Sequence, residues 1–138
     1  MPILDASFMI DVQRDVPGAV AILNAMVDAD EELLVPAQVA IEFMAGVPDA
    51  THAWKRITAA FSILDLDREQ MIAAAELGRT TRAEGTFAGW ADVQIAAAAR
   101  MQSTWVLTAD GTDFARMRVD HWDYRRGKGP ITYDEQGP

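Results

Sequence analysis

The chain contains no cysteine among its 138 residues. This absence excludes disulfides, thiolate metal ligands and cysteine nucleophiles. Long hydrophobic runs are absent as well, because no stretch approaches the roughly 20 apolar residues needed to span a bilayer. We therefore expect a cytoplasmic protein that makes no membrane contact.

Lysine and histidine are scarce. Only two of the twelve basic residues, Lys55 and Lys128, are lysines, and the others are arginines; the two histidines, His52 and His121, belong to no ligand-spaced motif. The net charge of −9 disfavours general nucleic-acid binding, since phosphate contacts need Lys and Arg. Arginine forks nevertheless suit phosphate recognition, and bound divalent cations would offset part of the negative charge. The acidity thus counts only weakly against a nucleic-acid substrate and favours a basic protein partner.

Short apolar segments alternate with helical patterns along the chain, whose length fits one domain. Strands are expected at 2–4, 33–35, 61–66 and 104–108 with an edge strand at 119–124, and helices at 7–11, 19–27, 36–46, 48–60, 68–82, 90–101 and 114–118. This alternation predicts an α/β protein with a mainly parallel sheet. Ser7 and Asp67 are expected to cap helices. The segment 125–138, with three glycines and two prolines, is expected to be mobile.

Five acidic residues stand where a predicted strand ends or a predicted helix runs along the sheet edge: Asp5, Glu42, Asp92, Asp110 and Asp113. Each alone has an ordinary explanation as a helix cap, an exposed helix residue or a turn residue. In a parallel sheet, however, these junctions converge on one edge. Clustered carboxylates repel one another unless a cation lies among them. Because hard oxygen ligands suit Mg²⁺ and Mn²⁺, the pattern predicts a metal site.

Other candidates for chemistry are weaker. Ser7 and Thr108 would act as nucleophiles only beside an activating base, so hydrogen bonding to a carboxylate is the better interpretation for both. The sequence shows no recognisable aromatic platform for stacking bases. The four tryptophans are expected in the core or in interfaces; they are Trp54, Trp90, Trp105 and Trp122.

Two segments in the first half of the chain resemble motifs of the PIN-domain family, in particular of the VapC-type toxins of prokaryotic toxin–antitoxin pairs. The opening LDASFMID resembles the family's LDTSxLID, with Asp5 as the first metal-binding acid and Ser7 as the usual hydroxyl. Ala6 replaces the common Thr. The segment VPAQVAIEFMAG resembles the second motif, a helix that carries Glu42.

Two further segments complete the resemblance. WADVQIAAAA resembles DxxIAAxA, with Asp92 as the acid, and LTADGTDF resembles T-x-[ND]-x-x-DF, with Thr108, Asp110 and Asp113. Asp110 stands where many relatives have Asn, so the resemblance leaves open which of Asp110 and Asp113 approaches the metal. The resemblance covers about residues 3–114. It implies a PIN-like three-layer α/β/α sandwich with a central, mainly parallel sheet of four or five strands, a PIN domain over 1–124 and a tail over 125–138.

The resemblance also implies a function, a Mg²⁺- or Mn²⁺-dependent endoribonuclease that acts as a toxin. Asp5, Glu42 and Asp92 would hold the ion, with Asp110 or Asp113 completing the site. The ion lowers the pKa of a bound water and stabilises phosphoryl charge, and hydrolysis leaves 5′-phosphate and 3′-hydroxyl ends. Family members are usually homodimers silenced by a small cognate antitoxin.

Further expectations rest on placement alone. The arginines expected near an RNA groove, where they would contact phosphates, are Arg14, Arg82 and Arg116. Two alternatives stay open, a catalytically silent PIN-like binding module and a phosphotransfer domain of the receiver or phosphatase type. The second alternative needs a lysine near the site, and Lys55 and Lys128 are poorly placed for it.

Overall fold

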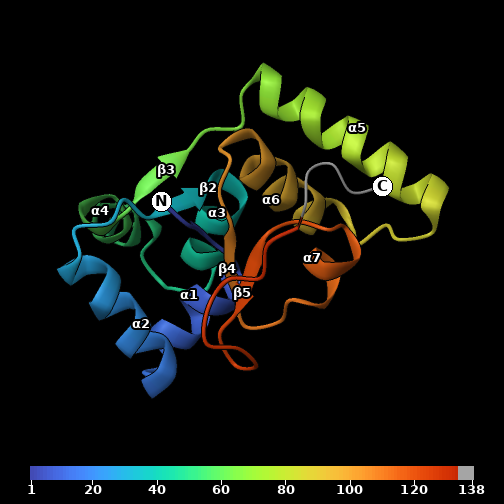
Figure 1. Cartoon of the computed structure of the whole chain (residues 1–138). Coiled ribbons are helices and arrows are strands. Elements are labelled where there is room, and N and C mark those ends of the chain that lie inside the picture. The colour runs from blue at the N-terminus through green and yellow to red at the C-terminus, as the bar shows by residue number, and fades with distance from the viewer. Residues whose placement is uncertain (134–138) are drawn as a thin grey trace.

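A computed structural model describes residues 1–133 as alternating strands and helices (Figure 1). The strands are β1 (Ile3–Leu4), β2 (Leu34–Pro36), β3 (Ser62–Leu64), β4 (Val106–Thr108) and β5 (His121–Asp123). The helices are α1 (Ala6–Gln13), α2 (Pro17–Asp28), α3 (Ala37–Ala45), α4 (Ala50–Ala60), α5 (Arg68–Glu84), α6 (Trp90–Met101) and α7 (Thr112–Arg116). Each predicted strand and helix is present, with ends that differ by a few residues.

The strands form one five-stranded sheet in the order β3-β2-β1-β4-β5, and all neighbours are parallel. In the register, Ile3 of β1 lies between Leu34 of β2 and Val106 of β4. The prediction of an α/β protein with a mainly parallel sheet of four or five strands is therefore confirmed.

Helices cover both faces of this sheet. The chain moves outward from β1 through β2 to β3, then returns to β4 beside β1, so right-handed crossovers place α1–α4 on one face and α5–α7 on the other. The helix contacts agree: α1 packs on α2 and α3, α3 on α4, and α6 on α5 and α7. Figure 1 shows the two groups on either side of the strands. The predicted three-layer α/β/α arrangement is confirmed.

The core consists of the central strands and the helix faces that cover them. Ile3, Leu4, Val106 and Leu107 are fully buried, which explains why β1 and β4 read as continuous apolar runs rather than alternating ones. Each such side chain stabilises the fold by about 1.5–3 kcal/mol relative to exposure. The small side chains at 96–99 are also buried, and they let α6 approach the sheet closely.

Local capping differs from the prediction at two places. Asp5, not Ser7, caps α1, because the Asp5 carboxylate accepts a hydrogen bond from the backbone N–H of Ala6. Ser7 lies inside the helix, where its hydroxyl bonds to other side chains. Pro36 ends β2 instead of opening α3. Asp67 caps α5 as predicted, through the N–H of Gln70.

The segment after β5 returns along the outer edge of the sheet as far as the structure describes it. Ile131 forms an antiparallel bridge with His121, and the Trp122 indole donates to the Gly127 carbonyl at 2.8 Å. The Tyr133 N–H donates to Asp120 at 2.7 Å. Residues 134–138 lie outside the described part, and the mobility expected for 125–138 stays a prediction. No helix within 1–133 is long and apolar enough to cross a membrane.

Candidate metal centre

The acidic residues gather where the direction of the chain reverses in the sheet. β1 leads outward to β2 while its other neighbour β4 leads to β5, and the crevice at the carboxyl ends of two such strands is the usual ligand position in α/β proteins. Asp5 follows β1 and Asp110 follows β4. Asp92 lies in the first turn of α6, whose far end leads into the start of β4, so Asp92 returns to the same edge.

Asp5 is held by a network of hydroxyl and amide groups. Its carboxylate accepts hydrogen bonds from Thr108 Oγ1 at 2.8 Å, from Ser7 Oγ at 3.0 Å and from the Ala6 N–H at 2.8 Å. The two hydroxyls also contact each other at 3.1 Å, and the Ala109 N–H donates to Ser7 Oγ at 3.0 Å. Ser7 and Thr108 therefore contact the carboxylate and fix its orientation.

The pKa of Asp5 shows that this network does not fully offset burial. Burial raises the pKa, the hydrogen bonds from Thr108, Ser7 and Ala6 lower it, and the charge of Glu42 raises it further, so the result is a pKa above the usual value. A buried carboxylate with a second carboxylate nearby is stabilised in its ionised form by a cation.

The pKa of Asp92 is also raised. Burial, a hydrogen bond to the Asp113 carboxyl and the charges of Asp5, Asp113 and Glu42 together raise the pKa of Asp92 to about 7. Three carboxyl groups that are far apart in the sequence therefore act on Asp92. A divalent cation among them would neutralise this repulsion and favour the ionised form of Asp92.

The two acids of the last motif have different surroundings. Asp113, in the first turn of α7, bonds to Asp92. The Asp110 carboxylate instead turns back on its own loop, where it accepts from the N–H and the hydroxyl of Thr112 at 3.1 and 2.8 Å. These Thr112 bonds lower the pKa of Asp110, against a smaller effect of burial, and the charges of Arg126 and Arg125 lower it further.

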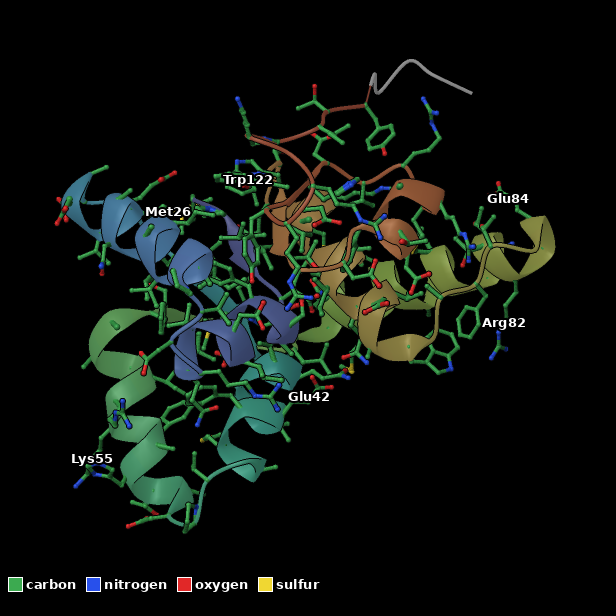
Figure 2. All side chains as sticks on the ribbon, turned by 90° about the horizontal axis from the view of Figure 1, so that it is seen from below. Met26, Glu42, Lys55, Arg82, Glu84 and Trp122 are labelled. Atoms are coloured by element: carbon green, nitrogen blue, oxygen red, sulfur yellow. The ribbon has the colours of Figure 1, made fainter. Side chains whose placement is uncertain are left out.

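Glu42 lies on the exposed side of α3, where Gln38 donates to its carboxylate at 3.4 Å (Figure 2). Its charge acts on both Asp5 and Asp92. No group of three or more His, Asp or Glu side chains within residues 1–133 is already arranged to hold a metal ion. The carboxyls thus face one another without forming a closed cage, and a bound cation would have to draw them together.

Two residues that support this site were not predicted from the sequence. Asp123, at the end of β5 and nearly buried, accepts the Gly111 N–H at 3.1 Å and so holds the loop between Asp110 and Asp113. A Cβ at Gly111 would lie 2.6 Å from Cδ2 of His121, so the loop approaches β5 closely only because this residue is glycine. The single sequence signal for Asp123 is its place at the end of the expected edge strand.

The three arginines expected near an RNA groove have different positions. Arg14 ends α1, and Arg116 lies 3.8 Å from Asp113 in an exposed ion pair. Arg82, in the last turn of α5, lies over the rings of Phe87 and Trp90. Only Arg116 contacts an acid of the cluster directly.

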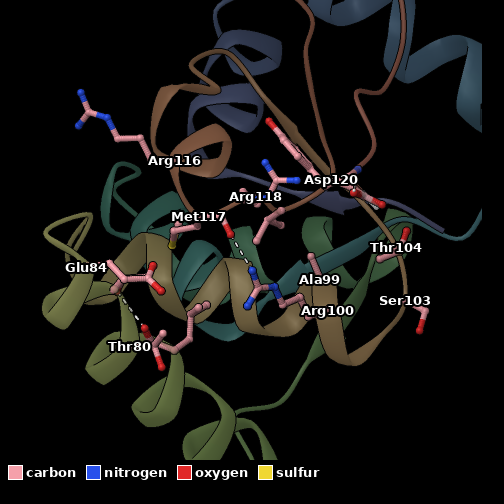
Figure 3. Close-up of a pocket in the computed structure, with 14 residues that line it drawn as sticks. Thr80, Glu84, Ala99, Arg100, Ser103, Thr104, Arg116, Met117, Arg118 and Asp120 are labelled. Atoms are coloured by element: carbon pink, nitrogen blue, oxygen red, sulfur yellow. Dashed lines mark hydrogen bonds between the residues drawn. The ribbon is translucent and has the colours of Figure 1, made fainter. Parts of the chain in front are cut away.

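A cavity of about 540 Å³ lies away from the acids (Figure 3). Arg100 and Ser103 line it at the far end of α6, about 12 Å along the helix from Asp92 at 1.5 Å per residue. Inside it, the Arg100 guanidinium donates to the Met117 carbonyl at 2.6 Å. This cavity is therefore separate from the edge of the sheet where Asp5 and Asp92 lie.

The donor set fits a hard divalent cation. The converging groups are carboxylate oxygens, and the chain contains no thiol that would favour a softer metal. Asp5, Asp92 and Asp113, with Glu42 from α3, would hold such an ion, since Mg²⁺ and Mn²⁺ bind through a few carboxylates and keep water in other positions.

Comparisons with known proteins bear on the fold and the family of the chain. The PIN domain family model matches residues 3–120, whereas no curated protein matches the chain. The structure resembles FitAcB from Neisseria gonorrhoeae, with 21% identity, 91% of this chain and 99% of that chain covered, and a TM-score of 0.77.

VapBC-1 from nontypeable Haemophilus influenzae is similar too, with 17% identity, 90% and 98% covered, and a TM-score of 0.73. VapBC2 from Rickettsia felis, bound to a DNA fragment from its promoter, has 16% identity, 88% and 98% covered, and a TM-score of 0.73. At such identities the structures support the fold, and the family model assigns the family. The chain belongs to the PIN domain family.

Proposed function

We propose that the protein is a Mg²⁺- or Mn²⁺-dependent endoribonuclease that acts as the toxin of a toxin–antitoxin pair. The observation that carries the proposal is that the carboxyl groups of Asp5, Glu42 and Asp113 lie close enough to Asp92 to raise, together with burial, the pKa of Asp92 to about 7. Acids assembled against their own repulsion mark a functional site, and this set lies at the edge of the sheet where α/β proteins bind ligands.

The chain's own residues have distinct tasks in this reaction. Thr108 and Ser7 hold the Asp5 carboxylate in one orientation through their hydrogen bonds. Because its pKa is raised to about 7, Asp92 must lose its proton before its carboxylate can bind a cation. A bound divalent ion would supply the Lewis acidity and the lowered water pKa that phosphodiester hydrolysis requires. Arg116, paired with Asp113 at 3.8 Å, lies where it can contact a substrate phosphate.

The test is cleavage of total RNA by the purified chain with Mg²⁺, with Mn²⁺ and with a chelator. Asp5→Asn and Asp92→Asn should each lower cleavage by at least roughly 10–100-fold, the loss typical even of second-shell changes at metal sites. Asp28→Asn is the matched control, since Asp28 is an exposed acid at the end of α2. Equal cleavage by all variants, with circular dichroism showing that they are folded, would reject the assigned site.

The same assay separates the two acids of the last motif. Because Asp113 bonds to Asp92 and Asp110 bonds to Thr112, Asp113→Asn should lose more activity than Asp110→Asn. Activity restored to Asp113→Asn by excess Mn²⁺ would place the defect in ion binding. A silent PIN-like binding module predicts no metal-dependent cleavage by the unaltered chain.

A phosphotransfer domain is disfavoured by the position of its required lysine. Lys55 lies on α4, whereas Glu42 lies on α3, and Figure 2 shows the two side chains well separated. Lys128 lies in the segment that returns along β5. A phosphoryl-donor assay that labelled Asp5 would reverse this judgement.

The partner is proposed to be a small basic antitoxin, with the toxin itself a homodimer. One similar structure is a toxin–antitoxin complex from Klebsiella pneumoniae, and the charge of −9 favours a partner that presents basic residues. Native purification of the tagged chain from its own host should recover such a protein. Recovery of the chain alone, at the mass of a monomer, would contradict both parts.

A further inference from the structure

Two aromatic rings and one arginine form a cluster at the junction of α5 and α6. The Arg82 guanidinium carbon lies 4.5 Å from the centre of the Phe87 ring and 4.9 Å from that of Trp90. The two rings meet edge to face, with centres 5.1 Å apart and planes at 72°. The two distances from the guanidinium carbon to the ring centres are within the range of cation–π attraction. The Arg82 side chain is therefore oriented by the two rings rather than by a carboxylate.

This manner of holding an arginine leaves its hydrogen-bonding capacity free. The five N–H donors lie in the plane of the guanidinium, and the two rings offer them no oxygen acceptor. Within residues 1–133, Arg82 has neither an ion pair nor a side-chain hydrogen bond, although the chain carries 21 acidic residues. Its planar fork is thus preorganised and available to an anion, and phosphate is the group that such a fork binds in two places at once.

Trp90 is fixed along one edge and open elsewhere. A Cβ at Gly78 of α5 would lie 2.3 Å from Cζ3 and 2.6 Å from Cη2 of Trp90, so only glycine at that position admits the ring. The residue nevertheless remains 44% exposed. A rigidly seated and partly exposed indole beside a free guanidinium combines a surface for stacking with a charge for a phosphate, the two elements that proteins use to bind single-stranded nucleic acid.

The cluster adjoins the acidic edge. Trp90 opens α6 and Asp92 follows two residues later, about 3 Å further along the helix axis but on another side of the helix. Figure 2 shows Arg82 near the end of α5, with the first turn of α6 between it and Glu42. A strand of RNA whose phosphodiester lies at the acids would continue past this turn toward Arg82.

We infer that Arg82, Phe87 and Trp90 form a binding site for unpaired RNA beside the cleavage site. Arg82 contacts a backbone phosphate, Phe87 orients the guanidinium, and an unpaired base stacks on Trp90. The inference rests on the proposed ribonuclease function and specifies its substrate as single-stranded at this position, because a base within a duplex cannot present its face to the indole.

Binding can be measured apart from cleavage. The probe is a short fluorescein-labelled RNA of mixed sequence, single-stranded or annealed to its complement, titrated in chelator so that it stays intact. Arg82→Ala and Trp90→Ala should each weaken single-strand binding by roughly 5–100-fold, the range of one stacking or charge contact. Arg79→Ala, an exposed arginine earlier on α5, is the matched control and should change binding little. Melting curves verify folding.

Two signatures distinguish a direct contact from a structural effect. Arg82→Ala should reduce the slope of log affinity against log salt by about 0.7, the value for one contact with a single strand, whereas Trp90→Ala should leave the slope unchanged. Trp90→Phe should retain most of the affinity yet lose the quenching of indole fluorescence that a stacked base causes. In metal, Arg82→Ala should raise KM and leave kcat nearly unaltered.

The outcomes separate this inference from the ribonuclease proposal. Unchanged RNA binding by Arg82→Ala and Trp90→Ala, with cleavage still dependent on Asp5 and Asp92, would overturn the inference alone. Equal affinity for the duplex probe would overturn it as well. Loss of a co-purifying protein partner by these variants, without loss of RNA binding, would assign the cluster to a protein contact. Chelator-independent RNA binding that needs Arg82, in a chain that never cleaves RNA, would support the inference and reject the nuclease.

Discussion

At the scale of single residues, the same side chain behaves in opposite ways at two places in this chain. Asp92 has a raised pKa because burial and three neighbouring acids oppose its charge. Asp11 is also buried, which raises its pKa, but hydrogen bonds from Tyr124 and Arg125 and the Arg125 charge prevail and lower it. The neighbouring groups therefore distinguish the two carboxylates. The ionised form of Asp92 needs a cation, whereas the ionised form of Asp11 stabilises the fold.

Asp11 permits a prediction for stability against pH. Its folded-state pKa lies below the unfolded value of about 3.9, so its contribution is present above that pH and is lost as the pH falls through the folded value. Asp11→Asn should cost about 1.5–3 kcal/mol at neutral pH, the range for hydrogen bonds to charged groups. The loss should shrink toward zero in acid, as measured by urea unfolding at several pH values.

A double-mutant cycle provides the control for this prediction. Tyr124→Phe removes the hydroxyl that donates to Asp11 and keeps the ring that packs edge to face on Phe8. Combined with Asp11→Asn, it should cost less than the sum of the two single changes, because both remove the same bond. Full additivity, or a loss from Asp11→Asn that does not depend on pH, would show that the carboxylate is not the stabilising group.

The acids of the candidate site were predicted from the sequence because each lies within a recognisable motif. Their relative standing was not, since Asp110 and Asp113 both fit the last motif and only the folded loop shows that one bonds to Thr112 and the other to Asp92. Asp123 escaped prediction for a similar reason. It acts through one backbone bond to Gly111 across twelve residues, and no local pattern reports such a contact.

At the scale of elements, apolar runs and alanine-rich periodicity sufficed to predict every strand and helix. Their ends were less predictable, since three-residue strands such as β3 and β4 carry little pattern and local caps compete. At α1, both Asp5 and Ser7 are good caps by residue type. Asp5 takes the role because β1 ends at Leu4, which leaves its carboxylate directly ahead of the first helical N–H groups.

The pairing of α5 with α6 lay beyond prediction from the sequence. Gly78 inside α5 reads as a weak position for a helix, and only the structure shows that it receives the edge of Trp90. The aromatic cluster around Arg82 was missed for this reason, because Gly78, Arg82, Phe87 and Trp90 share no simple spacing. Gly78 and Trp90 are twelve residues apart in the sequence, and only the folded structure brings them into contact.

At the scale of the whole molecule, the negative net charge opposes the binding of RNA at the proposed site. The net charge of −9 repels RNA at long range, and the four interacting acids concentrate that repulsion where cleavage is proposed. Arginines held away from carboxylates, as Arg82 is, offset it locally. A cation in the groove would offset it where it is strongest, so ion binding and RNA binding should reinforce each other.

The repulsion among the clustered acids predicts how a divalent ion affects the stability of the folded chain. The raised pKa of Asp92 means that its favourable contribution is complete below the unfolded value of about 3.9 and is lost as the pH rises through about 7. A bound ion should restore the loss, because it favours the ionised acids. At ten times its Kd, Mg²⁺ should stabilise the folded chain by about 1.4 kcal/mol, and more strongly above pH 7 than near about pH 5.

Thermal unfolding measured by differential scanning calorimetry tests this, provided that general screening is separated from ion binding. Sodium chloride at matched ionic strength relieves the repulsion of a net charge of −9 without occupying the site, so it should raise Tm less than Mg²⁺ does. In chelator above pH 7, Asp92→Asn should melt at a higher temperature than the unaltered chain, because it removes one repelling charge, and it should gain little from Mg²⁺. If sodium chloride matches Mg²⁺, or if Asp92→Asn keeps the full response, the acids relieve their repulsion by screening alone and the groove is not a metal centre.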